Sequence, residues 1–369
     1  MFLTIIVFIV ILGVLIFVHE FGHFAIAKLT GVEVEEFAFG FPPRLVSWKY
    51  KGTIYAINLI PLGGYVKLLG EEGEDEVSHI KSPKAFVNKS VATRIYIVVA
   101  GVIMNFILAI FLMTIGFSIG MTPLVSDPST MTGIKESQVM VTQVLAGSAA
   151  AKAGILTNDI LNGFSSITDL QTYTHAHAGQ TVNLSVLTNR QIKEVSVTLS
   201  TDLASPLGVS IASITKVKQP VGRALVTSVS ETGKAIGALF SFLWGIIKSF
   251  FTTGHAGAAA EGVVGPVGLF NFTAQALKIG WIYVLQLVVL LSINLGIINI
   301  LPFPALDGGK VLFLTLEGIF RRKIIRQEIE NIIHLIGFAL LILLLIAITF
   351  RDVSHFKFVA KVIKTIKKI

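Results

Sequence analysis

The segment IFVHEFGHFAIAKL contains two histidines four residues apart, His19 and His23, and a glutamate, Glu20, directly after the first. On an α-helix, positions i and i+4 lie on one face, so both imidazoles can bind a single metal ion. A catalytic zinc site needs three protein ligands and one position left for water. Glu20 lies beside the metal-binding face, where it can take a proton from that water and pass it to a leaving amine. The pattern therefore predicts a Zn²⁺ site suited to peptide hydrolysis, with Glu20 as its catalytic acid and base.

The motif lies within an apolar segment, residues 2–28, that is long enough to cross a bilayer. In a soluble chain an HExxH motif is common by chance and usually binds no metal. Each ionisable group near the centre of a membrane helix costs about 2.5–3.5 kcal/mol on insertion scales. Such groups are functional by default, so this setting strengthens the prediction of a zinc site.

We expect the third ligand to be Asp307, in the segment NLGIINILPFPALDGGK. Pro302 and Pro304 interrupt a helix just before it, and Gly308 and Gly309 allow the backbone to turn just after it. Irregular backbone at membrane depth is tolerated where it is buried or lines a cavity. An aspartate at the end of a helix can also be an ordinary loop residue, which is the competing interpretation.

Two asparagines, Asn294 and Asn299, lie upstream of this aspartate on the same apolar segment. Their amides can hydrogen-bond the backbone of a substrate or the oxyanion that develops during hydrolysis. The alternative is that they hydrogen-bond neighbouring helices. We treat both as candidate substrate-binding residues.

The segment GGYVKL begins with Gly63, Gly64, Tyr65 and Val66 and has the alternation of a β-strand. A peptide must be extended to be cut, so an exposed strand edge here could pair with an unwound substrate. The alternative is an ordinary hairpin that caps the helices. These four residues complete the set of candidate substrate-binding positions.

The composition indicates a membrane protein. Of the 369 residues, 53% are hydrophobic and 14% are charged, against about 25% charged in a typical soluble domain. The net charge is +8, and because the basic residues lie beside apolar segments, lipid headgroups are more suitable partners than nucleic acid. The absence of cysteine excludes disulfides, thiolate metal sites and a cysteine nucleophile.

We predict a polytopic α-helical membrane protein with about four transmembrane helices, each needing about 20 apolar residues. Residues 235–251 are shorter and carry Lys248, which suggests a helix at the membrane interface or packed on the bundle. In order, we expect helix 1 over residues 1–28, a β-rich membrane-associated loop over 29–93, helix 2 over 94–120, a soluble β-rich module over 127–202, the interfacial helix and a linker over 220–280, helices 3 and 4 over 281–350, and a basic amphipathic tail over 351–369.

The distribution of Lys and Arg predicts the orientation of these helices. No basic residue precedes Lys28, whereas the loops 29–93 and 321–326 are rich in them, so both loops are expected in the cytoplasm. The module 127–202 then lies outside. The basic tail also falls outside, against the rule, and we expect it to bind headgroups of the outer leaflet.

Together these segments resemble the site-2 protease family of intramembrane zinc metalloproteases, and most of all its PDZ-containing bacterial RseP-like type. The residues that carry the resemblance are HEFGH (19–23), FAFGFPPRL (37–45), GGYVKLLGE (63–71), AGVIMNFILAI (100–110), GVVGPVGLF (262–270) and NLGIINILPFPALDGGK (294–310). Residues 143–164, QVLAGSAAAKAGILTNDILNGF, resemble a PDZ domain, with Asn158–Asp159 where that pattern usually has Gly-Asp.

The resemblance implies zinc ligands His19, His23 and Asp307 and a catalytic Glu20. It also implies cleavage of the transmembrane segments of single-span proteins, such as anti-sigma factors or signal-peptide remnants, after a first cut outside the membrane. The implied location is the bacterial inner membrane, with the active site toward the cytoplasm and the PDZ-like domain outside. The chain departs from the family in having one PDZ-like module where some members have two, and in having Lys310 where some members have histidine.

Two other functions compete with proteolysis. A transporter or channel could use intramembrane histidine and aspartate, but it would have inverted repeats and paired broken helices, which the sequence does not suggest. A catalytically inactive scaffold presenting the PDZ-like module is the other possibility, and the intact Glu20 argues against it.

Overall fold

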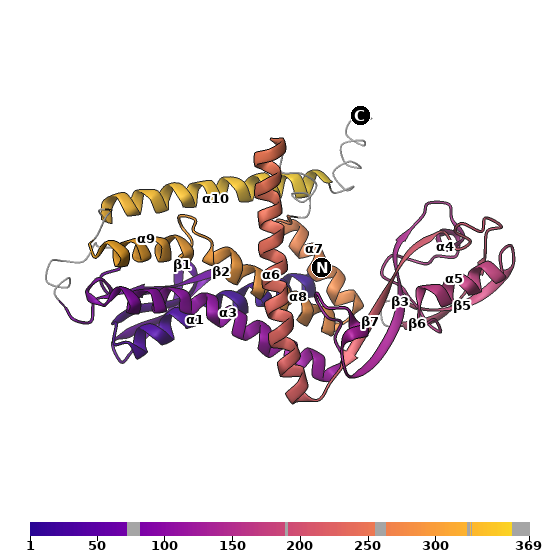
Figure 1. Cartoon of the computed structure of the whole chain (residues 1–369), viewed down its shortest axis with the longest axis horizontal. Helices are drawn as coiled ribbons and strands as arrows, with labels where there is room; N and C mark the ends of the chain where they lie inside the picture. The colour runs from indigo at the N-terminus through magenta and orange to yellow at the C-terminus, as the bar shows by residue number, and fades with distance from the viewer. Residues whose placement is uncertain (72–81, 189–190, 255–262, 323–324, 326, 356–369) are drawn as a thin grey trace. The chain divides into compact units, whose positions relative to one another are not determined.

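The structure is a computed structural model that describes residues 1–71, 82–188, 191–254, 263–322, 325 and 327–355 (Figure 1). They form two compact units, one of Met1–Ile110, Ala235–Ala274 and Leu287–Ile369, the other of Phe111–Lys234 and Gln275–Gln286. Residues 72–81 of the predicted β-rich loop and most of the predicted basic tail lie outside the described residues.

Five helices in the described part of the chain are long and apolar enough to cross a membrane. Their candidate spans are Phe2–Leu29 (α1), Val91–Ile119 (α3), Val221–Thr253 (α6), Trp281–Ile300 (α8) and Ile329–Ser354, which lies within α10 (Gln327–His355). The chain therefore has the composition and helix lengths of a polytopic membrane protein.

The structure adds helices that the apolar pattern did not predict. Helix α6 begins at Val221, well before the apolar stretch 235–251, so this helix is longer than expected. Two shorter helices flank α8, namely α7 (Pro266–Ile279) and α9 (Asp307–Phe320). Proline at the first position of α7 fits its start, because the missing N–H would have no partner there.

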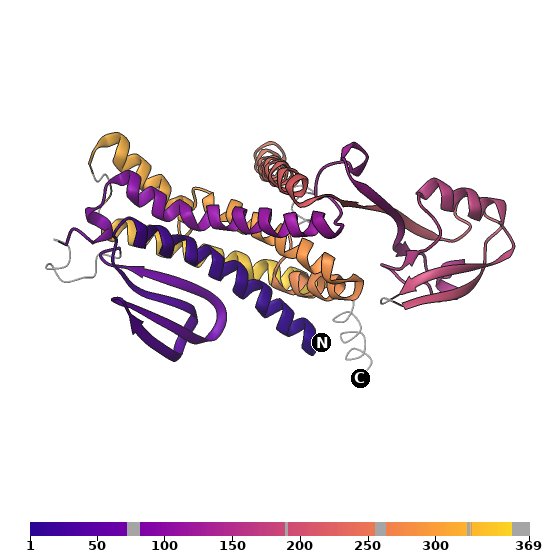
Figure 2. The same cartoon turned by 90° about the horizontal axis from the view of Figure 1, so that it is seen from below.

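Helices α1 and α3 approach each other closely at a pair of glycines, and Figure 2 shows α1 running along α3. A Cβ atom added to Gly22 of α1 would lie 2.4 Å from the carbonyl oxygen of Ala100 and 2.9 Å from the Cα of Gly101 on α3. Small residues at such crossings let backbones pack against each other. The packing of these two helices therefore depends on the absence of a side chain at position 22.

A β-hairpin lies beside α1 and is formed by β1 (Val34–Tyr50) and β2 (Thr53–Leu68) (Figure 2). The hairpin folds over on itself, because residues of β1 such as Phe39 pair with both Ile57 and Gly64 of β2. The last part of β2, residues 64–68, has β1 on one side and no second strand among the described residues. It therefore forms an edge of this small sheet.

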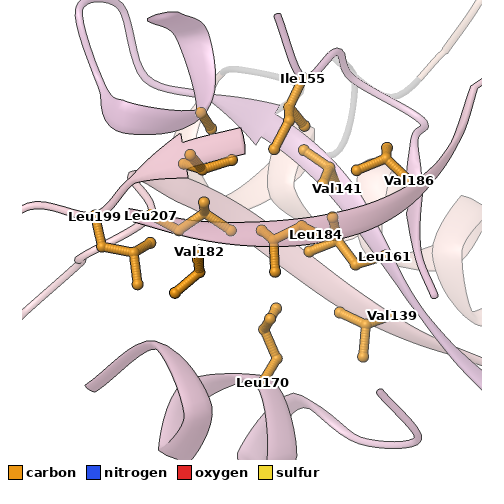
Figure 3. Packing of buried hydrophobic residues seen from close by; sticks show 12 residues of the cluster. Val139, Val141, Ile155, Leu161, Leu170, Val182, Leu184, Val186, Leu199 and Leu207 are labelled. Carbon is orange, nitrogen blue, oxygen red and sulfur yellow. The ribbon is translucent and has the colours of Figure 1, made fainter. Parts of the chain in front are cut away.

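The second unit contains a five-stranded antiparallel sheet in the order β6-β5-β4-β3-β7. Its strands are β3 (Ile134–Val144), β4 (Ile160–Leu161), β5 (Thr181–Thr188), β6 (Gln191–Thr198) and β7 (Val209–Lys218), and its helices are α4 (Ala149–Lys152) and α5 (Ile167–Ala176). Side chains from the strands and Leu170 of α5 form one apolar core (Figure 3). Strand β7 lies after residue 202, so the sheet continues beyond the segment expected from sequence.

Glu231 on α6 is fully buried and is bound by the segment that follows α3. Its carboxylate accepts hydrogen bonds from the backbone N–H groups of Leu124, Val125 and Ser126, at 3.2, 3.1 and 3.3 Å, and from the Ser126 hydroxyl. A buried charge is stable only when it is compensated in this way. The contact fixes the start of α6 within the second unit.

Asp352, near the end of α10, caps the N-terminus of α7 within the first unit. Its Oδ2 accepts hydrogen bonds from the N–H groups of Gly265 and Gly268, at 2.9 and 3.0 Å. A carboxylate at a helix N-terminus satisfies donors that have no partner within the helix and interacts favourably with the helix dipole. The last helix is thereby joined to the segment that precedes α8.

We predict that Gly22→Ala destabilises the helix bundle by about 1–3 kcal/mol, the usual cost of overpacking a close contact. The added methyl group would collide with backbone atoms of α3, which cannot move as a flexible side chain can. Thermal unfolding in detergent measures the change. Gly237→Ala on α6 is the matched control, because its Cβ meets no atom within 4 Å, and it should be neutral or slightly stabilising. Equal effects of the two substitutions would contradict this account.

Candidate zinc site

His19, His23 and Asp307 meet in the first unit, and their ligand atoms all lie within 4.8 Å of one another. The His19 Nε2 to His23 Nε2 distance is 3.2 Å, and the Asp307 Oδ2 lies 3.0 Å from His19 Nε2 and 3.4 Å from His23 Nε2. The two histidines lie one turn apart on α1, and the aspartate is the first residue of α9. The structure thus brings together the three residues expected to be ligands.

These separations fit a tetrahedral zinc ion. Zinc bonds to nitrogen and carboxylate oxygen are about 2.0–2.1 Å long, which places the ligand atoms of a tetrahedral site about 3.3 Å apart. The three distances of 3.0–3.4 Å match this spacing. Two imidazoles and one carboxylate form a donor set of the kind found in catalytic zinc sites, where a fourth position remains for water.

The outer nitrogens of both imidazoles are held by neighbouring groups on α3. His23 Nδ1 donates to the backbone oxygen of Ile97 at 2.9 Å, and the amide of Asn105 lies 3.1 Å from His19 Nδ1. Such contacts fix the tautomer and leave Nε2 of each ring available to a metal. Asn105 is fully buried, and its Oδ1 has no hydrogen-bond partner in the described part of the chain. Turning the amide by 180° gives that oxygen the His19 N–H as a donor.

Two glycines allow backbone segments to pack closely against the side chains of the site. A Cβ on Gly101 of α3 would lie 2.4 Å from His23 Nε2 and 2.8 Å from His19 Cε1. A Cβ on Gly64 of β2 would lie 3.3 Å from the Cγ of Glu20. Because these positions have no side chain, the backbone of α3 lies close to the two histidines and the backbone of β2 lies close to Glu20.

The turn before Asp307 is built from irregular backbone. Ala305 has φ of 74°, a left-handed conformation that costs a non-glycine residue about 1–2 kcal/mol. Its N–H donates to His334 Nδ1 of α10 at 2.9 Å. Gly308 and Gly309 pack against carbonyl oxygens of the preceding turn, where a Cβ would lie 2.2 and 2.5 Å away. These contacts hold the aspartate at the start of α9.

A carboxylate must be ionised to bind a metal. The imidazoles of His19 and His23, whose Nε2 atoms lie 3.0 and 3.4 Å from the Asp307 Oδ2, favour that charged form.

A cavity of about 250 Å³ contains the three candidate ligands and Glu20, and it is also lined by Tyr65 and Val66 of β2. Burial, together with a hydrogen bond to Glu36 at 3.0 Å, raises the pKa of Tyr65, so its hydroxyl stays protonated as a donor. Gly63 has φ of 130°, which a side chain would rarely adopt. The edge segment of the hairpin therefore lies beside the metal site.

The two asparagines of α8 take different places. Asn299 Nδ2 lies 3.2 Å from His19 Nε2, so this amide borders the metal site. Asn294 lies five residues before Asn299 and is half-buried. Because a helix has 3.6 residues per turn, the two asparagines lie on different faces of α8. The structure therefore places Asn299, but not Asn294, beside the candidate metal site.

Sequence reasoning missed several residues of the site. Gly101 and Asn105 lie in the segment that resembles the second span of the site-2 proteases, and an asparagine inside an apolar span is itself a signal of a polar partner. The Lys310 side chain contacts Glu71 with an Nζ to Oε1 distance of 2.6 Å, and both line the same cavity. That pairing joins segments far apart in the chain, which no local pattern could reveal.

Comparison with known proteins identifies the family. The pattern of Peptidase family M50 matches residues 7–344. A candidate zinc metalloprotease of Clostridium acetobutylicum is 36% identical over 362 residues, covering 96% of this chain and 98% of the relative.

Two further relatives carry more specific names. The zinc metalloprotease RasP of Shouchella clausii is 28% identical over 440 residues, covering 95% of this chain and 99% of the relative. The regulator of sigma-W protease RasP of Bacillus subtilis is 28% identical over 437 residues, covering 95% and 98%. The resemblance to site-2 proteases is thereby confirmed, and so are the predicted enzyme class and cofactor. The chain belongs to Peptidase family M50, the site-2 proteases, and is a zinc metalloprotease.

Proposed function

We propose that this protease cleaves transmembrane segments of single-span membrane proteins, after another protease has removed most of their outer part. The observation that carries the proposal is the placement of two candidate zinc ligands, His19 and His23, within the apolar helix α1, beside Asp307 and the strand edge of β2. The Bacillus subtilis relative is named a regulator of sigma-W, which supports anti-sigma factors as one substrate class. Signal-peptide remnants are a second class with the same single-helix form.

In the proposed site, His19, His23 and Asp307 hold zinc, and Glu20 is the general base and acid. When bound, zinc polarises a peptide carbonyl and lowers the pKa of a water molecule. Glu20 takes the proton from the attacking water and delivers it to the leaving amine. The amide of Asn299 lies where it can hydrogen-bond the reacting carbonyl group.

The hairpin edge formed by residues 64–68 of β2 supplies backbone partners for the substrate. Unwinding a helix in lipid costs several kcal/mol for each backbone group left unpaired, so the enzyme must replace those hydrogen bonds. An extended segment added to this edge recovers them by strand addition. Gly64 has no side chain, which leaves room between the strand and Glu20. Tyr65 and Val66 lie on the same edge segment, and Gly63 directly precedes it.

The directions of the helices support four crossings rather than five. The late residues of both α1 and α8 reach the zinc site, as His19 and Asn299 show, so these two helices run in the same direction. Helix α3 runs opposite to α1, because its residue Ile97 contacts His23 and Asn105 contacts His19. Since α3 runs opposite to both α1 and α8, it ends on the side of the membrane where α8 begins. The chain between α3 and α8 must therefore cross the membrane an even number of times. Helix α7 is too short to cross, so we place α6 along the interface or against the bundle.

We place the protein in the bacterial inner membrane, with the zinc site toward the cytoplasm and the five-stranded sheet outside. The Lys and Arg residues around α9 support this orientation. We interpret the sheet unit as a PDZ-like domain that admits only substrates with a small outer part. Its support is the antiparallel sheet with a packed helix α5, together with the sequence resemblance of residues 143–164.

We predict that Glu20→Gln retains zinc but lowers the cleavage rate by at least about 100-fold, since a general base typically contributes 10²–10⁴-fold. The amide keeps the shape of the side chain but cannot accept the proton. Cleavage of a single-span substrate in liposomes and zinc analysis of the purified protein are measured on the same sample. Near wild-type cleavage by the variant would refute the proposed role.

We predict that Asp307→Ala abolishes stoichiometric zinc binding, whereas Asn105→Leu weakens zinc affinity by about 10–100-fold, the usual effect of removing a partner of a metal-binding histidine. The first change removes a ligand, and the second removes the group beside His19 Nδ1. Zinc content is measured during titration with a chelator. Asp127→Ala, at an exposed turn far along the chain, is the control and should leave zinc binding unchanged. Full zinc retention by Asp307→Ala would exclude that ligand.

We predict that proline at position 65 or 66 slows cleavage without removing zinc. Successive strand residues direct their N–H groups to opposite sides, so one of these two positions donates to the free edge, and proline removes that donor. The loss should be larger for a substrate with a stable helix than for one weakened by Gly, Pro or Asn near the scissile bond. Equal fractional losses on both substrates would show that the edge takes no part in unwinding.

A further inference from the structure

A second cleft adjoins the zinc cavity in the first unit. It has a volume of about 530 Å³ and lies among α3, α9, α10 and the segment after β2. Its size is within the 300–1,000 Å³ typical of ligand-binding sites. Glu71 and Lys310 line both the cleft and the zinc cavity. Their ion pair is therefore the shared wall between the two spaces.

The lining of the cleft combines apolar and charged side chains. Phe313 and Leu316 of α9 and Leu335 and Phe338 of α10 belong to its apolar part. Among the charged residues, Arg94 forms two hydrogen bonds with Glu317, at 3.1 and 2.5 Å. Apolar surface beside paired charges suits a peptide segment with apolar side chains.

The charged groups in the lining are paired with one another. Arg94 contacts Glu317, Lys310 contacts Glu71, and His334 Nε2 lies 3.9 Å from Glu330 Oε1. These pairs leave the apolar side chains as the surface for a bound segment, and the shared wall with the zinc cavity makes a substrate peptide the suitable occupant.

The direction of β2 connects the two spaces. Tyr65, Val66 and Leu68 line the zinc cavity, and Glu71, three residues further on, lines both the cavity and the cleft. A substrate strand that pairs with this edge is therefore directed, at one of its ends, toward the Glu71–Lys310 ion pair.

We propose that this cleft is a second substrate-binding subsite, which holds an extended apolar segment of the substrate on one side of the scissile bond. The proposal rests on the proposed function, because it requires that a peptide be bound along β2. It assigns Phe313, Leu316, Leu335 and Phe338 to substrate recognition beyond the zinc cavity.

Disulfide cross-linking tests this subsite in the full-length protein, which has no cysteine of its own. A Leu316→Cys variant reports on the cleft, and Thr315→Cys is the matched control, because Thr315 is an exposed neighbour on the same helix that does not line the cleft. The probe is a single-span model protein whose helix carries Asn-Pro at its centre, with one cysteine moved stepwise along it. Both variants carry Glu20→Gln to slow turnover, and zinc content confirms that they are folded.

We expect Leu316→Cys to cross-link to a short run of probe positions on one side of the scissile bond, at least about tenfold above Thr315→Cys. Phe313→Cys should give the same run, so that a local defect at one position cannot decide the result. Equal yields for Leu316→Cys and Thr315→Cys, or cross-links on both sides of the scissile bond, would overturn the subsite.

A Val66→Cys variant separates this result from the proposed function, because Val66 lines the zinc cavity. Cross-linking at Val66 without cross-linking at the cleft would reject the second subsite and leave cleavage along β2 standing. Failure at both positions would reject both proposals together.

Discussion

The structure depends on the close packing of α1 against α3. The backbone of α3 at Ala100 and Gly101 lies directly against Gly22 and the two histidines. This contact allows Ile97 and Asn105 to reach the outer nitrogens of His23 and His19. In an apolar bundle, each of these polar groups would otherwise be unsatisfied, at a cost of several kcal/mol. A packing contact between glycines thus determines the orientation of the imidazoles.

The irregular segment before α9 solves a second problem, which is how to bring a carboxylate to the histidines. A continuous helix would carry Asp307 away along its axis. The left-handed Ala305 and the two glycines after Asp307 turn the chain back, and His334 binds the N–H that this turn exposes. Strained backbone concentrated at functional sites is a general pattern, and here it lies within a few residues of the candidate ligand.

Much of this organisation could be predicted from the sequence. The apolar runs predicted four of the long helices, and the proline and glycine residues around Asp307 predicted a break in the helix at that place. The length of α6 could not be predicted, because the helix continues into polar sequence whose Glu231 is stabilised by backbone donors far away in the chain. Gly101, Asn105 and the Glu71–Lys310 pair depend on which helix faces meet. A hydrophobic pattern predicts that a segment is helical, but it does not predict which residues of other helices its polar side chains will contact.

The placement of the site along the chain also bears on how the protein is made. Its histidines leave the ribosome well before Asp307, which emerges only after three of the four helices proposed to cross the membrane. Asp352 comes later still, and until it appears the N-terminus of α7 lacks its cap. A nascent chain therefore cannot bring the three candidate ligands together until α9 has been made, so the proposed metal site is completed only late in synthesis.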